Sequence, residues 1–169
     1  MTEEEKRKAA VQHVVHDYAN LVSARTEICR FPKPPLNSHV QYSFLVGCRK
    51  FGIFFSSTPP RHKDEIVACH FLRKKVSFDL TEWSKWRDHM NVHLLHLSYG
   101  RVDDTRPWTG YDDLNKEILE EFRAAWKKFR AHVHEPYKAE FAKQVFYAEA
   151  TSFLQADLGV SGFGFRLKA

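Results

Sequence analysis

Three histidines at helical spacing form the part of this sequence whose residue types could do chemistry. His89, His93 and His96 stand at positions i, i+4 and i+7. At about 100° per residue they form one narrow stripe on a helix, with apolar residues on both sides of it. Imidazoles between apolar arcs are costly to bury unless they are hydrogen-bonded, paired or used in a reaction. The stripe therefore needs an explanation, and three are open.

A metal site is one explanation of the stripe. Histidines at i and i+4 can both reach one divalent ion. Three ligands along one helix would span about 10 Å at about 1.5 Å per residue, which is far for one ion. The segment also lacks the acidic residue of an H-E-x-x-H pair. We therefore expect any such metal-binding bundle to combine two of these histidines with a ligand from elsewhere, such as His13, His16 or Asp17.

Arg87 adds a second kind of chemistry to this segment. Together with His93 it gives the spacing R-x5-H in Arg87-Asp-His-Met-Asn-Val-His93, followed by His96-Leu-Ser-Tyr99. This pattern resembles the R-x(4–6)-H motif of the HEPN superfamily of small all-α proteins. The resemblance covers about a dozen residues and the expected helical architecture. It implies an RNA-binding protein or a metal-independent ribonuclease, without a cofactor, that forms a homodimer in which two motifs face one cleft.

The resemblance also implies roles for single residues. Arg87 would hold a phosphate, and His93 would be the general acid or base for attack by a ribose 2′-OH. Asp88, His96 and Tyr99 would support this pair. On a straight helix, six steps of about 100° place Arg87 and His93 about 120° apart. They would therefore meet at a dimer cleft or through the long arginine side chain.

A purely structural role is the third explanation. Neutral imidazoles at the edge of an apolar stripe can bond to a nearby carbonyl or carboxylate. Arg87 could pair with a carboxylate such as Glu82 or Asp104 instead of a phosphate. The chain would then be a non-enzymatic helical domain that acts through a protein partner.

The elements that must position these residues are helices. Apolar residues at a period near 3.6 predict helices over residues 3–29, from 112 or 113 to 134, and over 137–154. Thr81 is the expected N-cap of the helix that carries the histidines, and Glu117, Glu120 and Glu121 indicate a solvated helix face. Residues 38–56 indicate a helix, with a hairpin across residues 47–50 as the alternative. Residues 64–72 indicate a short element that is either helical or extended, with one or two helical turns as the favoured form.

These elements predict one all-α domain over residues 1–169. We expect a bundle of four or five helices joined by short irregular or extended connectors. The tail from residue 159 contains glycines and either packs through its phenylalanines or stays loose. The composition agrees, because 43% hydrophobic and 14% aromatic residues can fill a core, while seven glycines and seven prolines argue against an all-β chain.

The charge balance indicates which ligands are possible, and the cysteines indicate the cellular compartment. Lys plus Arg is 26 and Asp plus Glu is 21, which permits binding to nucleic acid or to other anions. The tryptophans have core-like spacing, although exposed ones could stack on bases. The three cysteines are isolated, as expected for buried free thiols in a reducing cytoplasm. No apolar run is long enough to cross a membrane, so we expect a cytoplasmic protein without a membrane partner. The basic clusters are Lys6-Arg-Lys8, Arg49-Lys50, Arg61-His-Lys63, Arg73-Lys-Lys75 and Lys127-Lys128 with Arg130.

Overall fold

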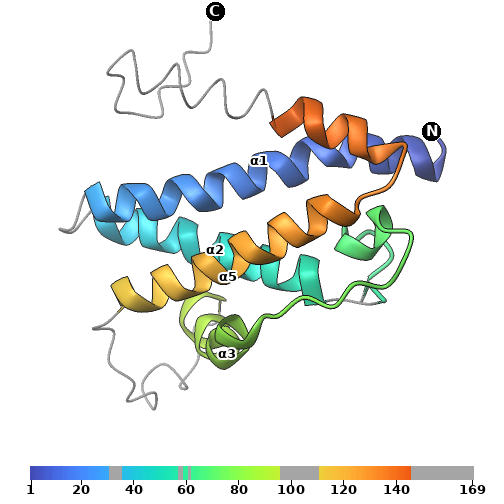
Figure 1. Cartoon of the computed structure of the whole chain (residues 1–169). Helices are drawn as coiled ribbons and strands as arrows, with labels where there is room; N and C mark the ends of the chain where they lie inside the picture. The colour runs from blue at the N-terminus through green and yellow to red at the C-terminus, as the bar shows by residue number, and fades with distance from the viewer. Residues whose placement is uncertain (31–35, 57–58, 61, 96–110, 146–169) are drawn as a thin grey trace, which may run out of the picture.

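The computed structural model describes residues 1–30, 36–56, 59–60, 62–95 and 111–145. The helices are α1 (Glu3–Arg30), α2 (Leu36–Ser56), α3 (Thr81–Leu95), α5 (Tyr111–His132) and a last helix over residues 137–145, with a short 3₁₀ helix η1 (Ala68–Phe71). In Figure 1, α1 and α2 run antiparallel beside each other and α5 crosses them. The described residues contain no strand, only an isolated bridge between Leu72 and Val133. The predicted all-α class is therefore confirmed.

α1 begins at a reciprocal cap. The backbone N–H of Glu5 donates to Thr2 Oγ1 at 3.2 Å, and the Thr2 N–H donates to Glu5 Oε2 at 2.6 Å. This capping box satisfies two N–H groups that the first helical turn leaves without partners. From there the predicted stripe faces the core, where Val11, Val14, Val15, Leu21 and Ala24 are buried.

Residues 38–56 form part of the helix α2 and not a hairpin, so the helical alternative is confirmed. One face of α2 buries Phe44, Cys48, Phe51, Phe54 and Phe55. Two glycines on this helix let its neighbours approach closely: Gly47 faces Leu21 of α1, and Gly52 faces the indole of Trp83 on α3. The strand-forming residues near its end are thus held helical by packing on both sides.

The core is built largely from aromatic rings, and α5 supplies its central row. Trp126 stacks on Tyr18 of α1 with ring centroids 4.2 Å apart, and Phe129 is fully buried beside it. Phe141 of the last helix packs against Phe129 at 5.3 Å. The apolar residues that predict α5 from their helical spacing are all buried, which confirms this helix and its core-facing side. They are Ile118, Leu119, Phe122, Ala125, Trp126, Phe129 and, directly after the helix, Val133.

Several boundaries differ from the sequence-based prediction: α2 begins at Leu36 instead of residue 38, and α5 begins at Tyr111 instead of residue 112 or 113. Only residues 68–71 of the short element at 64–72 are helical, as one 3₁₀ turn. α5 ends at His132, because Val133 pairs with Leu72 instead of continuing the helix. The predicted helical residues 146–154 and the tail from residue 159 lie outside the described part of the chain. Among the residues that the structure describes, no helix is long and apolar enough to cross a membrane.

Candidate functional site

Arg87 lies at the surface of α3. Its Nε donates to Asp88 Oδ1 at 3.0 Å, and its Cζ lies 6.0 Å from the centroid of the Trp83 ring. The side chains of Arg87 and Asp88 are 45% and 77% exposed, so this pair contributes little to stability. Arg87 thus pairs with a carboxylate, as the structural explanation expects, but with Asp88 and not with Glu82, whose Oε1 accepts a hydrogen bond from Lys85 Nζ at 2.6 Å.

Of the histidine stripe, the structure describes only the backbone of His89 and His93. His89 and His93 lie on α3, but their side chains are outside the described part, as are His96, Tyr99 and Asp104. The pairing of Arg87 with His93 therefore stays a prediction. Among the described side chains, no three His, Cys, Asp or Glu residues are grouped to hold a metal ion.

Asp17 and Cys48 have structural roles. Asp17, considered as an additional metal ligand, accepts a hydrogen bond from Lys50 Nζ at 2.9 Å. Cys48 is fully buried, and this burial raises the pKa of its thiol well above the usual value. Cys48 is therefore a protonated core residue, as expected for a buried free thiol. Cys69 lies within η1 and is half-buried.

Glu121 holds the N-terminus of α3 from a distance. Its two carboxylate oxygens accept hydrogen bonds from the backbone N–H groups of Glu82 and Trp83 at 2.8 and 2.9 Å. The expected N-cap, Thr81, instead donates its hydroxyl to Asp79 at 2.7 Å. The prediction of Thr81 as N-cap and the assignment of Glu121 to a solvated face are therefore both wrong. Glu121 of α5 thus fixes the first turn of α3, and through it the position of Arg87 on that helix.

The Glu121 cap predicts a specific pH dependence. Burial raises the pKa of Glu121 above its usual value of 4.5, while the two backbone N–H donors oppose this shift. A raised pKa in the folded state means that the folded chain binds this proton more tightly. That contribution to stability is present below pH 4.5 and is lost as the pH rises through the folded-state pKa.

We therefore expect Glu121→Gln to cost about 1 kcal/mol at neutral pH through the weakened cap. The wild type should gain stability relative to Glu121→Gln as the pH falls from neutral towards 5 in urea unfolding. Glu120→Gln is the matched control, because it removes only the exposed pair with Arg123 and should stay within about 0.5 kcal/mol of wild type. If the difference in unfolding free energy between the wild type and Glu121→Gln instead grew towards high pH, the raised pKa of Glu121 would be contradicted.

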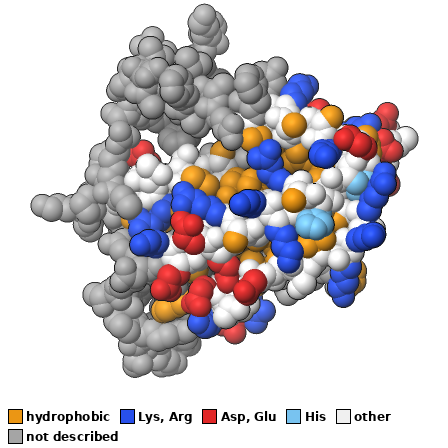
Figure 2. All heavy atoms as spheres, viewed as in Figure 1, with side chains coloured by type: hydrophobic (Ala, Val, Ile, Leu, Met, Phe, Trp, Pro, Cys, Tyr) orange, Lys and Arg blue, Asp and Glu red, His pale blue; other side chains and the backbone are white. Residues whose placement is uncertain are grey.

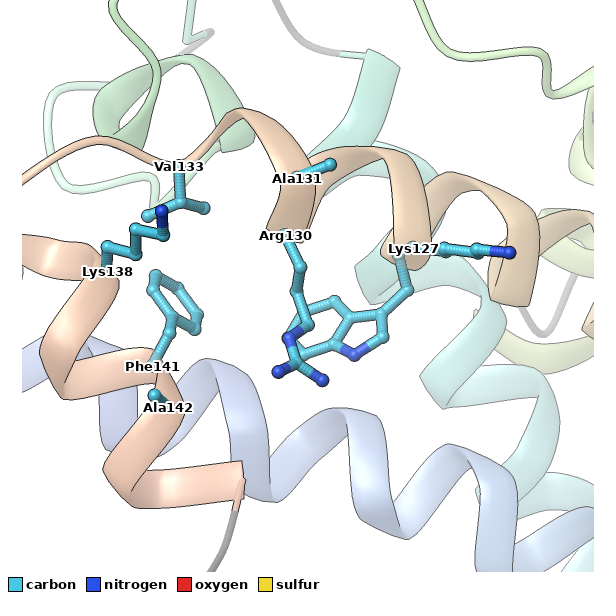
Figure 3. Close-up of a pocket in the computed structure, with 8 residues that line it drawn as sticks. Lys127, Arg130, Ala131, Val133, Lys138, Phe141 and Ala142 are labelled. Atoms are coloured by element: carbon cyan, nitrogen blue, oxygen red, sulfur yellow. The ribbon is translucent and has the colours of Figure 1, made fainter.

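A basic cleft lies between α5 and the last helix. It has a volume of about 390 Å³ and is lined by residues of α5, of the connection and of the last helix. Figure 3 shows Lys127 and Arg130 extending from α5, with Lys138 and Phe141 extending from the last helix. None of its eight lining residues is acidic: Trp126, Lys127, Arg130, Ala131, Val133, Lys138, Phe141 and Ala142.

The cleft has small side chains among its lining residues and a buried aromatic floor. Ala131 on α5 and Ala142 on the last helix are both exposed and offer only methyl groups. Below them, Trp126 and Phe141 are 7% and 2% exposed, so their rings belong to the core. In Figure 2, apolar side chains show through the middle of this face with Lys and Arg side chains around them.

A second basic element borders α5 near the same end. The backbone N–H of His134 donates to Phe71 O at 3.2 Å, and Lys128 Nζ donates to Ser77 O at 2.7 Å. These bonds hold residues 71–78 along α5 and place the exposed run Arg73-Lys-Lys75 beside a hollow of about 180 Å³. Val133 lines the basic cleft and Leu72 lines this hollow, and the two residues are paired. The two basic elements therefore adjoin, and we call them together the basic face.

Sequence reasoning found part of this face. The basic clusters at 73–75 and at 127, 128 and 130 are evident in the sequence, whereas Lys138 belongs to none of them. Its signal is the spacing to Phe141, because residues three apart are neighbours on a helix and Phe141 is buried. The tryptophans were expected in the core, and Trp83 and Trp126 are buried there.

Comparison of the chain with known protein families, with curated proteins and with solved structures gives no match.

Proposed function

We propose that this protein is an RNA-binding helical domain whose basic cleft holds the phosphate backbone. One observation carries the proposal: three cationic side chains from two helices surround a hollow of about 390 Å³ that has no acidic lining residue. Phosphate contacts by Lys and Arg supply most of the affinity of proteins for nucleic acids. The resemblance of the α3 segment to the HEPN motif supports RNA as the ligand.

The arrangement of charges on α5 supports the same proposal. In the middle of the helix, Arg123 pairs with Glu120 at 2.6 Å, so the charges there are partly neutralised. From residue 124 to its end, α5 carries no acidic residue, and Lys127, Lys128 and Arg130 are all exposed. The C-terminal end of a helix also carries a partial negative charge, which stabilises cations placed near it. The C-terminal half of α5 thus displays positive charge that a polyanion can neutralise.

The test is RNA binding measured by fluorescence anisotropy at several salt concentrations. We expect Arg130→Ala and Lys138→Ala each to weaken binding several-fold and to lower the slope of log K against log salt by about 1. The control is Lys50→Ala, which removes the same charge from α2, where Lys50 pairs with Asp17. It should leave the slope within error of wild type. Equal losses in all three variants would show an effect of net charge alone and would contradict binding at the cleft.

Cleavage of the bound RNA is a separate part of the proposal. The side chain of Arg87 is available for it at the surface of α3, while the contribution of His93 stays a prediction. The labelled RNA of the binding assay, recovered after incubation with EDTA, also reports whether the wild-type protein cleaves it. Loss of cleavage in Arg87→Ala with binding retained would assign the two activities to different places on the molecule.

A further inference from the structure

We infer that the basic face binds double-helical RNA through its sugar–phosphate backbone and does not bind unpaired bases. This inference rests on the proposed function and names the form of RNA that the same surface takes. Proteins that bind single strands combine a basic groove with exposed aromatic rings on which bases stack. Proteins that bind duplex RNA use phosphate and 2′-OH contacts and the shape of the helix. The exposure of aromatic rings on the basic face therefore distinguishes the two.

The rings at the basic cleft have no free face. Trp126 is stacked on Tyr18 with an interplanar angle of 13°, and Phe51 and Phe141 meet it edge to face at 6.2 and 6.1 Å. Phe141 is itself packed against Phe71 at 5.4 Å. With 7% and 2% exposure, Trp126 and Phe141 show the cleft only a small part of their surface. A base entering the cleft would find no aromatic plane to stack on.

The other aromatic rings of the basic face also offer no free plane on which a base could stack. Tyr137 and Phe71 are buried where the last helix and η1 meet α5. Phe78 lines the hollow beside Arg73-Lys-Lys75, where it is half-buried and packs against Phe55 with ring centroids 4.8 Å apart. Among the described side chains of Phe, Tyr and Trp, Tyr42 is the exposed one, and it lies on α2. The basic face therefore presents mainly cations and methyl groups, which suit phosphates and ribose, and the partly exposed ring of Phe78 is already packed against Phe55.

The charges favour a duplex as well. A double helix carries about one phosphate charge per 1.7 Å of its axis, against about one per 3.4 Å for one strand. Lys127 and Arg130 are three residues apart, which is about 4.5 Å along the axis of α5. Lys138 and the run Arg73-Lys-Lys75 come from elements beside the same end of α5. Cations grouped on adjoining elements can neutralise more phosphates of a dense duplex than of a single strand.

The experiment compares a labelled RNA hairpin with an unstructured RNA strand of equal length, using the full chain at physiological salt. We expect the hairpin to bind about tenfold more tightly, with a steeper salt dependence. Changing the stem sequence while keeping the base pairs should leave the affinity within about twofold. Equal or tighter binding of the unstructured strand would overturn this inference and leave RNA binding intact. Binding of neither RNA would overturn the proposed function itself.

A variant that fills the cleft without changing charge tests whether the backbone enters it. Ala142→Leu adds a side chain that helices accept well at an exposed position that lines the cleft. It should weaken hairpin binding about fivefold while thermal unfolding shows the fold unchanged. Ala139→Leu is the matched control, because Ala139 is exposed on the same helix and does not line the cleft. Equal hairpin affinity of the two variants and the wild type would contradict entry into the cleft.

Discussion

Phe129→Ala is expected to lower the free energy of unfolding by about 4 kcal/mol. The side chain of Phe129 has no exposed surface, and its ring centroid lies 5.3 Å from both Phe54 and Phe141 and 6.1 Å from Phe71. It therefore joins α2, η1, α5 and the last helix at one point. Removing the ring leaves a cavity that four elements would have to close together, and close packing allows only part of that relaxation.

Urea unfolding followed by circular dichroism measures this loss. Phe129→Leu is the control, because it keeps much of the volume and should cost about 1–1.5 kcal/mol. If the alanine variant lost no more stability than the leucine variant, Phe129 would not be the central packing residue that the ring distances indicate.

Gly52→Ala is expected to destabilise the protein by about 2 kcal/mol although alanine favours helices. A Cβ at residue 52 would lie 1.8 Å from Cε2 and 2.2 Å from Nε1 of Trp83. Trp83 is 3% exposed and carries a buried Nε1 without a hydrogen-bond partner among the described residues, so its ring has little room to move. The added methyl group must therefore push α3 away from α2.

The same helix provides the control. A Cβ at Gly47 would lie 3.0 Å from Cδ1 and 3.3 Å from Cβ of Leu21, whose flexible end can shift. The gain in helix propensity then offsets the crowding, and Gly47→Ala should stay within about 1 kcal/mol of wild type. Urea unfolding followed by tryptophan fluorescence compares the two variants. Equal stability of both would contradict the close packing of Trp83 on Gly52.

The helices could be predicted because burial repeats along the sequence with the period of a helix. This is clearest for α5, where every predicted core position from Ile118 to Val133 is buried. α2 was less certain, because Phe51-Gly-Ile-Phe-Phe55 is rich in strand formers. Packing resolves it, since Phe51, Phe54 and Phe55 all reach the core from one helical face and packing outweighs a weak local propensity.

The contacts that build the candidate site depend on residues far apart in the sequence. Glu121 caps α3 at backbone groups 38 and 39 positions away, and no local pattern indicates this. The basic cleft likewise requires residues of α5 and of the last helix to line one hollow, which no spacing within either helix shows. The R-x5-H spacing on α3 gave a specific hypothesis for catalysis, whereas the described side chains favour binding at the basic face.

Lysine footprinting of the wild-type protein tests the central claim most directly. The protein is labelled with an amine-reactive reagent with and without bound RNA hairpin, and the modification of each lysine is measured by mass spectrometry. We predict that the hairpin protects Lys127 and Lys138 and leaves Lys50 and Lys85, which are paired with acidic residues on α1 and α3, unchanged. Protection of Lys50 and Lys85 without protection of Lys127 and Lys138 would contradict RNA binding at the basic cleft.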